Sequence, residues 1–229
     1  LHFKQVFKVI ELMGYPWAKD LVHVPFGMVS FEGETLSTRK GHVVYLDEVL
    51  DRACEKALDI INEKNPELPD KQKVARQVGI GAVIFYDLFS SRIKDVDFWW
   101  DRALNFEGET GPYVQYAHTR CCSVIAKAPV CAVEKADFSV LEDEASKELI
   151  AKLEAFPSIV AEAAEKYEPS VITRYSAALA QCYNKFYFEN RILSETEPVL
   201  QARLLVTKCT RDVLKTALGL LGIAAPQKM

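Results

Sequence analysis

The 229-residue sequence lacks any apolar run of the roughly 18–20 residues that cross a bilayer, so no membrane span is predicted. Its six cysteines include no C-x-x-C pair, which argues against a zinc site or a disulfide framework and predicts reduced thiols in a cytoplasmic protein. Glycine and proline, at 10 residues each, are too few for a low-complexity chain. The first residues include no initiator methionine, basic n-region or apolar h-region, so this segment is not expected to be a signal peptide. Because Leu1 falls at the start of a helical pattern, we expect an excised piece of a longer protein.

Charge of one sign is not in large excess either. With 28 basic and 32 acidic residues the net charge is −4, which excludes a protein that coats nucleic acid through bulk charge. The charges are unevenly distributed, however. Residues 132–168 carry ten acids and four bases, whereas residues 169–229 carry eight bases and four acids. The positive excess of the last segment permits a surface that faces nucleic acid, without requiring one.

Apolar residues at helical spacing predict a mostly α-helical chain. A helix over 2–13, extended segments within 21–31 and a β-branched strand at 42–46 together indicate the end of an α/β layer. An aromatic crossover loop is expected at 97–100 and an acidic connection at 132–144. The later helices are expected from a capping Asp47 to before Pro66, from a capping Asp70 to about Leu88, and over 111–127, 145–155, 157–167, 169–188 and 198–221.

A short polar loop is the first candidate site. Ser37, Thr38, Arg39, Lys40 and Gly41 put two hydroxyls, two cations and a flexible glycine in succession. Such a loop can donate hydrogen bonds and positive charge to phosphate oxygens. The G-x-x-x-x-G-K-[ST] spacing of a P-loop is absent, and composition alone favours a solvated turn.

The helix opened by Gly111 and Pro112 carries the second candidate. Tyr113, Tyr116 and Arg120 occur at i, i+3 and i+7, so they share one face near the helix N-terminus. Exposed tyrosines there would form a platform for unstacked bases, whereas spacing alone favours an aromatic stripe buried against a neighbouring helix. His118 has no Ser, Cys or carboxylate partner at a meaningful spacing for nucleophilic catalysis.

Two further groups have weaker patterns. The acid pair Glu107 and Glu109 could serve acid–base chemistry only if both lay in one cleft. A second aromatic cluster lies on a basic helix with Lys185 and Arg191, and its spacing predicts that half of it is core. That cluster comprises Tyr183, Phe186, Tyr187 and Phe188.

Several stretches of the sequence occur in a characteristic order. They are an N-terminal helix, HVPFGMV, the LSTRKG loop, HVVYLDEVL, then WWDRALNFEGETGPYVQYAHTR and the C-terminal LGIAAPQKM. In this order they resemble the arginyl-tRNA synthetases from His2 to Met229, and GETGPYVQYAHTR is the most specific segment. The resemblance implies a mostly α fold, in which a helical anticodon-binding bundle carries a small α/β remnant of a Rossmann-type catalytic domain.

The resemblance also implies a domain plan and a reaction. Residues 1–46 would end the catalytic domain, 47–100 would be the connecting helices that contact the tRNA stem, and 101–229 the anticodon-binding domain. Family members are class I synthetases that join arginine to tRNA(Arg) with ATP and Mg²⁺ through an arginyl-adenylate, usually as monomers. The class I H-x-G-H motif is absent from these 229 residues, so the chain alone is not expected to catalyse aminoacylation. The alternative is a non-catalytic helical tRNA-binding or assembly module derived from a synthetase. A third possibility is a helical scaffold with no nucleic-acid role.

The resemblance assigns roles to particular residues. The loop departs from the lysine–methionine–serine–lysine–serine form of the second class I signature, and Arg39 and Lys40 would be its catalytic cations. The ATP-phosphate loop comprises Ser37, Thr38, Arg39, Lys40 and Gly41, the active-site helix contributes His2 and Gln5, and the anticodon-binding residues are Tyr113, Tyr116, Arg120, Tyr187 and Met229. No metal site formed by protein side chains is predicted.

Overall fold

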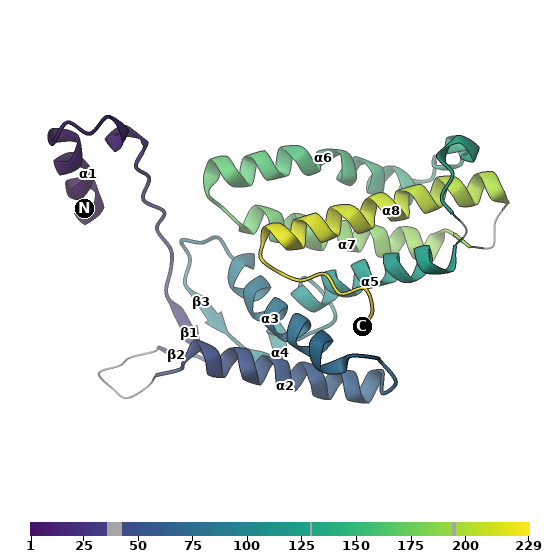
Figure 1. Cartoon of the computed structure of the whole chain (residues 1–229), viewed down its shortest axis with the longest axis horizontal. Helices are drawn as coiled ribbons and strands as arrows, with labels where there is room; N and C mark the ends of the chain where they lie inside the picture. The colour runs from purple at the N-terminus through teal and green to yellow at the C-terminus, as the bar shows by residue number, and fades with distance from the viewer. Residues whose placement is uncertain (36–42, 129, 194–195) are drawn as a thin grey trace.

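The computed structural model describes all residues except 36–42, 129 and 194–195, so the predicted phosphate loop Ser37–Gly41 lies outside the described residues. The mostly α-helical prediction is confirmed, and Figure 1 shows long helices with a small sheet at one end. The elements are α1 (His2–Leu12), η1 (Pro16–Asp20), β1 (Val29–Phe31), β2 (Glu34–Thr35), α2 (Leu46–Lys64), α3 (Lys71–Phe89), β3 (Val96–Phe98), α4 (Trp100–Ala103), α5 (Gly111–Lys127), η3 (Val133–Lys135), η4 (Phe138–Val140), α6 (Glu144–Lys166), α7 (Ser170–Glu189) and α8 (Glu197–Leu220).

The small sheet has the strand order β2-β1-β3. Strand β1 pairs antiparallel with β2 and parallel with β3, with Ser30 opposite Asp97. The Asp97 carboxylate accepts hydrogen bonds from Gly33 N–H at 3.0 Å and Ser30 Oγ at 2.8 Å, and these bonds hold the pKa of Asp97 below its usual value. The prediction of a loop at 97–100 is therefore wrong, because residues 96–98 pair with a strand 67 positions away that local pattern does not reveal.

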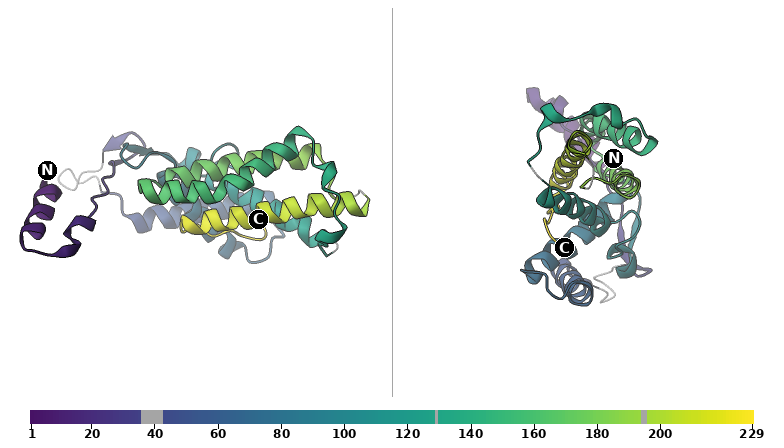
Figure 2. Two further views of the ribbon diagram at one scale, coloured as in Figure 1. Left: turned by 90° about the horizontal axis from the view of Figure 1, so that it is seen from above. Right: turned by 90° about the vertical axis from the view of Figure 1, so that its right-hand side faces the viewer.

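The predicted strand at 42–46 is also wrong for the residues that the structure describes. Residues 43–45 have no regular structure and Leu46 already belongs to α2. β-Branched residues favour a strand only where a partner strand completes the ladder. Helix α1 and η1, which precede the sheet, stand apart from the long helices at the left end of the molecule (Figures 1 and 2).

Helices α2 and α3 form an antiparallel pair with close backbone contact. At Gly79 of α3, a Cβ atom would lie 2.6 Å from the carbonyl carbon of Ala53 and 2.7 Å from Cys54 N. One predicted cap is wrong and the other is confirmed in position. Tyr45 rather than Asp47 is the N-cap of α2, whereas Asp70 is the N-cap of α3, although its side chain makes no cap hydrogen bond.

Helices α5 to α8 form the bundle, and Figure 2 shows α6, α7 and α8 running side by side. The predicted break between 145–155 and 157–167 is wrong, because α6 runs through Pro157. Proline removes one backbone donor from the helix ladder, the one that would bond the Leu153 carbonyl. At the neighbouring residue the Tyr175 hydroxyl of α7 donates at 2.8 Å to the Lys152 carbonyl, which ties this turn of α6 to α7. Packing on α7, with Leu149 and Ala163 buried on either side of Pro157, keeps one helix in place.

Among the residues that the structure describes, two groups of buried side chains form the interior. The larger lies within the bundle and includes Phe85 from α3. The smaller joins α2, α3, β3 and α4, with Phe106 and Met229 packed against it. Helix α3 contributes to both, so it connects the bundle to the sheet end. None of the helices in the described part of the chain is long and apolar enough to cross a bilayer.

Candidate nucleic-acid interface

The start of α5 is held firmly in place. Thr110 caps the helix by accepting a hydrogen bond from Tyr113 N–H at 3.3 Å, and Pro112 occupies its first turn. Gly111 lies against α3 so closely that a Cβ would be 2.8 Å from the carbonyl oxygen of Gly81. The side chains of the first two turns of α5 therefore project from a rigid base.

Arg120 lies between helices α5 and α7 and contacts an aromatic ring from each. Its guanidinium carbon is 5.1 Å from the ring centroid of Tyr116 and 5.0 Å from that of Tyr187. Both rings are open to solvent, with 43% of Tyr116 and 42% of Tyr187 exposed. The buried-stripe interpretation is therefore wrong for Tyr116, and the structure brings Tyr187 to the same face. Cation–π contacts of this kind hold the guanidinium in place between the two rings.

Asn184 of α7 completes this group, and sequence reasoning missed it. Its Nδ2 donates to the Tyr113 hydroxyl at 2.8 Å, and its Oδ1 accepts a hydrogen bond from Arg120 Nη1. Tyr113 itself is half-buried against the bundle core. The signal in the sequence is the i, i+3 spacing of Asn184 and Tyr187. We call Tyr113, Tyr116, Arg120, Asn184 and Tyr187 the tyrosine–arginine cluster.

The second aromatic cluster divides as predicted. Tyr183 and Phe186 are fully buried, whereas Tyr187 is exposed and Phe188 is 90% exposed. Lys185 between them forms an ion pair with Glu148 at 3.0 Å, so α6 offsets part of the positive charge of this helix. The exposed half of the cluster faces solvent on the same helix as Asn184.

Met229 reaches a pocket that also contains Tyr116. This terminal pocket, about 440 Å³ in volume, has an apolar lining from α2, Phe106, Tyr116 and Met229. Lys64, Asn65 and Glu107 are its polar residues, and Asn65 Nδ2 donates to the Met229 carbonyl at 3.2 Å. The pocket therefore offers aromatic and thioether surface beside hydrogen-bonding groups, which suits a flat ring with polar edges.

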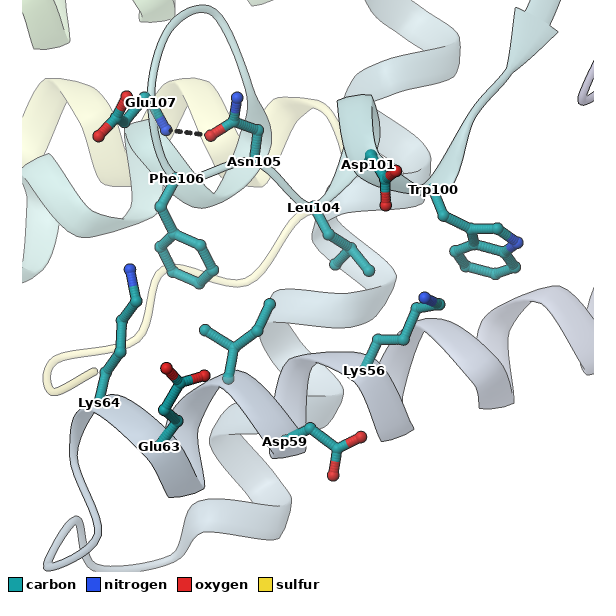
Figure 3. Close-up of a pocket in the computed structure, with 11 residues that line it drawn as sticks. Lys56, Asp59, Glu63, Lys64, Trp100, Asp101, Leu104, Asn105, Phe106 and Glu107 are labelled. Carbon is teal, nitrogen blue, oxygen red and sulfur yellow. Dashed lines mark hydrogen bonds between the residues drawn. The ribbon is translucent and has the colours of Figure 1, made fainter.

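A second hollow of about 470 Å³ continues from the terminal pocket along α2. Figure 3 shows Phe106 above α2, with Lys64 and Glu63 on one side and Lys56 and Trp100 further along the helix. Its lining mixes both signs of charge, because Asp59, Glu63, Asp101 and Glu107 accompany the two lysines. It is therefore no electropositive groove for a phosphate backbone.

Glu107 and Glu109 do not lie in one cleft. Glu107 lines the hollows beside Phe106, whereas Glu109 lines a different one near Phe85 and Tyr86. Both side chains are exposed on the turn that leads into α5. The structure therefore gives no support to acid–base chemistry by this pair.

His118 is a buried residue that holds the C-terminus of the chain. It is 2% exposed, and its Nδ1 lies 2.9 Å from the carbonyl oxygen of Pro226. The structure does supply a thiol neighbour that the spacing argument missed, Cys122 Sγ at 3.7 Å from Nε2. Burial lowers the pKa of His118 and raises the pKa of the Cys122 thiol, which is the opposite of an activated thiolate.

His2 and Gln5 lie on α1, and both are exposed. Phe3 beside them stacks on His23 with ring centroids 4.1 Å apart, which anchors α1 to the segment after η1. Figure 1 shows that α1 is far from the tyrosine–arginine cluster on α5 and α7. These two predicted residues therefore belong to a different part of the molecule from the candidate interface.

Two family models together cover most of the chain. Residues 1–100 match the catalytic domain of the class I tRNA synthetases (R), and residues 114–229 match the DALR anticodon binding domain. The chain is 52% identical to an arginine–tRNA ligase of Halothermothrix orenii and 50% identical to one of Clostridioides difficile. Each match takes in the whole chain but only 40% of the relative.

Solved structures agree with these matches. The arginyl-tRNA synthetase of Thermus thermophilus superimposes with a TM-score of 0.89 at 36% identity, covering 98% of this chain and 38% of that one. The enzyme of Plasmodium falciparum has the same fold, with a TM-score of 0.81 at 23% identity over 100% of this chain and 39% of that one. The chain thus spans about 40% of the length of the curated relatives it matches.

Proposed function

The chain belongs to the arginyl-tRNA synthetase family, and from that premise we propose that it is the C-terminal part of an arginine–tRNA ligase that binds the anticodon loop of tRNA(Arg). The observation that carries the proposal is Arg120, which lies over two exposed tyrosine rings beside a pocket closed by Met229. Rings stack on unpaired bases, and a guanidinium held between rings pairs with phosphate. Sequence-specific RNA recognition targets loops whose bases can splay out in this way.

Each member of the site has a proposed role. Tyr116 and Tyr187 are the stacking surfaces, and Arg120 contacts the loop phosphates. Asn184 orients Arg120 by accepting its hydrogen bond, and the Tyr113 hydroxyl in turn holds Asn184. The exposed edge of the Tyr113 ring contacts the RNA. Phe106 and Met229 bind one splayed base in the terminal pocket, with Asn65 and Lys64 available to its polar edge.

We place three units along the chain. Residues 1–46 end the catalytic domain, 47–100 connect it and contact the tRNA stem, and 101–229 bind the anticodon. The larger group of buried side chains supports the third unit, because all of its fully buried members except Phe85 lie within residues 101–229. The smaller supports the second, although it also takes in residues 103–104. The whole ligase works as a cytoplasmic monomer in this proposal.

The complete ligase would activate arginine with ATP and then transfer it to tRNA(Arg). In that reaction Arg39 and Lys40, with Ser37, Thr38 and Gly41, hold the ATP phosphates as pyrophosphate leaves. His2 and Gln5 line the pocket beside them. We propose that Mg²⁺ accompanies ATP and binds through its phosphate oxygens, as is usual in phosphoryl-transfer sites. The described residues gather no group of three His, Cys, Asp or Glu side chains suited to a metal ion.

The second candidate function is a non-catalytic tRNA-binding or assembly module derived from a synthetase. The phosphate loop distinguishes the two, because a pure binding module has no use for hydroxyls and cations that grip ATP. The match of residues 1–100 to the catalytic-domain model favours the ligase.

The anticodon proposal predicts a specific loss on removing one ring. Tyr116→Ala is expected to weaken binding of a tRNA(Arg) anticodon stem-loop by about 1–2 kcal/mol, because one stacked base loses its platform. Tyr113→Ala is expected to act in the same direction. Fluorescence anisotropy at low salt measures this, and wild-type affinity should fall as salt is raised.

Tyr15→Ala is the matched control, since Tyr15 is 45% exposed and lies near α1, away from α5 and α7. It should leave the affinity unchanged. If Tyr116→Ala, Tyr113→Ala and their double variant all bind the stem-loop as tightly as wild type does, the rings belong to packing rather than to recognition.

The phosphate loop makes a separate prediction for the full-length ligase. Arg39→Ala is expected to slow adenylate formation on the order of tenfold while weakening ATP binding less, because the cation stabilises charge that develops as pyrophosphate leaves. Arginine-dependent pyrophosphate exchange and equilibrium ATP binding measure the two effects. Equal losses in both would indicate a uniform binding contact.

A further inference from the structure

The C-terminal tail, residues 223–229, has no regular secondary structure but is held along its length by side chains. Helix α8 ends at Leu220, Gly222 turns the chain with a φ of +74°, and Ile223 is then buried. Figure 1 shows the tail passing from α8 across α5 toward α2. An irregular chain end of this kind ordinarily frays unless it is tied down.

Three donors from one face of α5 tie it down. Gln115 Nε2 donates to the Ala224 carbonyl at 2.8 Å, and Thr119 Oγ1 donates to the Pro226 carbonyl at 3.0 Å. His118 Nδ1 lies 2.9 Å from that same oxygen, and a carbonyl only accepts, so the ring carries its proton on Nδ1. Both lone pairs of one carbonyl are thus used by neighbouring residues of one helix.

These donors are buried, which makes the contact costly to break. Gln115 is 0%, His118 2% and Thr119 6% exposed. Gln115 Nε2 also donates to the Gln77 carbonyl of α3 at 3.1 Å, so the tail is connected to two helices. A buried donor that loses its acceptor pays the full cost of desolvation, so the tail position is strongly specified.

The tail ends in the pocket assigned to RNA. Pro226 is buried and its carbonyl contacts His118 and Thr119, and three residues later Met229 lines the terminal pocket beside Tyr116. Tyr116 lies between Gln115 and His118 on the same helix, so the donors and the stacking ring share one rigid support. We propose that Gln115, His118 and Thr119 are positioning residues for RNA binding, which fix the tail so that Met229 closes the pocket before RNA arrives. This inference rests on the proposed anticodon binding.

Preorganisation is the physical gain. A free tail would have to be ordered when RNA binds, and the lost conformational freedom would reduce affinity. Holding Met229 in advance removes that cost. Each donor then affects RNA affinity only by positioning Met229. Removing a donor should therefore have no effect once Met229 is replaced, whereas a general loss of stability would lower affinity in both backgrounds.

A double-mutant cycle between Thr119 and Met229 tests this. Thr119→Val keeps the shape but removes the donor, and it is expected to weaken binding of the tRNA(Arg) anticodon stem-loop on the order of fivefold. In a Met229→Ala background the same change should have almost no further effect. Thr119→Ser, which keeps the hydroxyl, should restore most of the wild-type affinity. Thr210→Val is the matched control, because Thr210 is also buried but donates to its own helix at the Val206 carbonyl.

Two further measurements complete the test: one compares two His118 variants whose folding is checked, and the other follows release of the tail without RNA. His118→Asn keeps a donor near the Nδ1 position and should bind RNA better than His118→Leu, with both variants checked for folding by circular dichroism. Carboxypeptidase should release Met229 faster from Thr119→Val than from wild type or Thr210→Val, because the tail detaches more often.

The failures are distinguishable. If the wild-type chain does not bind the stem-loop, the proposed function falls and the positioning role falls with it. If wild type binds and Met229→Ala weakens binding, but Thr119→Val causes the same loss in both backgrounds, only the positioning role is overturned. An unchanged rate of Met229 release also overturns it.

Discussion

Replacing Arg120 with alanine is expected to weaken binding of the tRNA(Arg) anticodon stem-loop roughly 30- to 150-fold, about 2–3 kcal/mol, which exceeds the loss from either single ring. Three effects combine in this one change. The guanidinium lies over the rings of Tyr116 and Tyr187, so its removal frees both rings. It leaves Asn184 Oδ1 without its charged donor, and it removes one phosphate contact. Titration of labelled stem-loop at several salt concentrations measures affinity and salt dependence together.

Two variants make the Arg120 experiment specific. Arg120→Lys keeps the charge but lacks the planar guanidinium, so it should recover only a small part of the affinity. Arg174→Ala removes the same charge from an exposed position on α7 and should cost little. The salt dependence should become shallower by about one phosphate contact in Arg120→Ala. If Arg174→Ala and Arg120→Ala lose equal affinity, net charge rather than the tyrosine–arginine cluster drives binding.

Substituting Gly79 with alanine is expected to reduce the free energy of unfolding by about 3 kcal/mol, the largest stability effect among these predictions. The new Cβ would lie 2.6 Å from the Ala53 carbonyl carbon and 2.7 Å from both its oxygen and Cys54 N. These are backbone atoms of α2, so no side-chain rotation relieves the overlap and the two helices must separate. Ala53 and Val78, fully buried at this crossing, would then lose contact. Urea denaturation followed by circular dichroism measures the loss.

Gly219→Ala is the matched control for this substitution. Gly219 also lies in a helix, α8, but nothing is within 4 Å of its Cβ position. Alanine there should be neutral or should stabilise the protein by up to about 1 kcal/mol, because it favours the helix. A Gly79→Ala variant as stable as wild type would contradict the close approach of α2 and α3. Because α2 ends at Lys64 and its C-cap Asn65, which both line the terminal pocket, the same variant should also weaken RNA binding.

Some residues of the candidate interface are placed by interactions between near neighbours in the chain and others by contacts between distant segments. The sequence predicts the first kind better than the second. Helix α5 and the common face of Tyr116 and Arg120 follow from a cap, a first-turn proline and spacings within seven residues. Asn184 and Phe106 were missed because local pattern does not show what they contact: the i, i+3 spacing of Asn184 and Tyr187 places them on one face of α7 without indicating Arg120. Their roles come from Arg120 and Met229, which lie 64 and 123 positions away in the chain.

The incorrect predictions have related causes. Pro157 is a local signal for a helix end, but packing of α6 on α7 outweighs the one hydrogen bond it removes. Strand β3 has only three residues and depends on pairing with β1. His118 lacked a partner by sequence spacing, although Cys122 at i+4 and the Pro226 carbonyl, 108 positions away, both contact it. Each case shows tertiary contacts deciding where local preference is weak.

By itself the sequence determined the helical class, the position of most helices, the common face of α5 and, through the order of its motifs, the family. These properties depend on periodicity, capping and residue type, which act over a few neighbouring positions. Only the tertiary structure decided that Arg120 lies over a ring from α7, that Met229 shares a pocket with Tyr116, and that buried donors of α5 hold the C-terminal tail. Such contacts join segments far apart in the chain. They form because the helices share one core, and only one arrangement of each helix both buries its apolar face and pairs its polar groups.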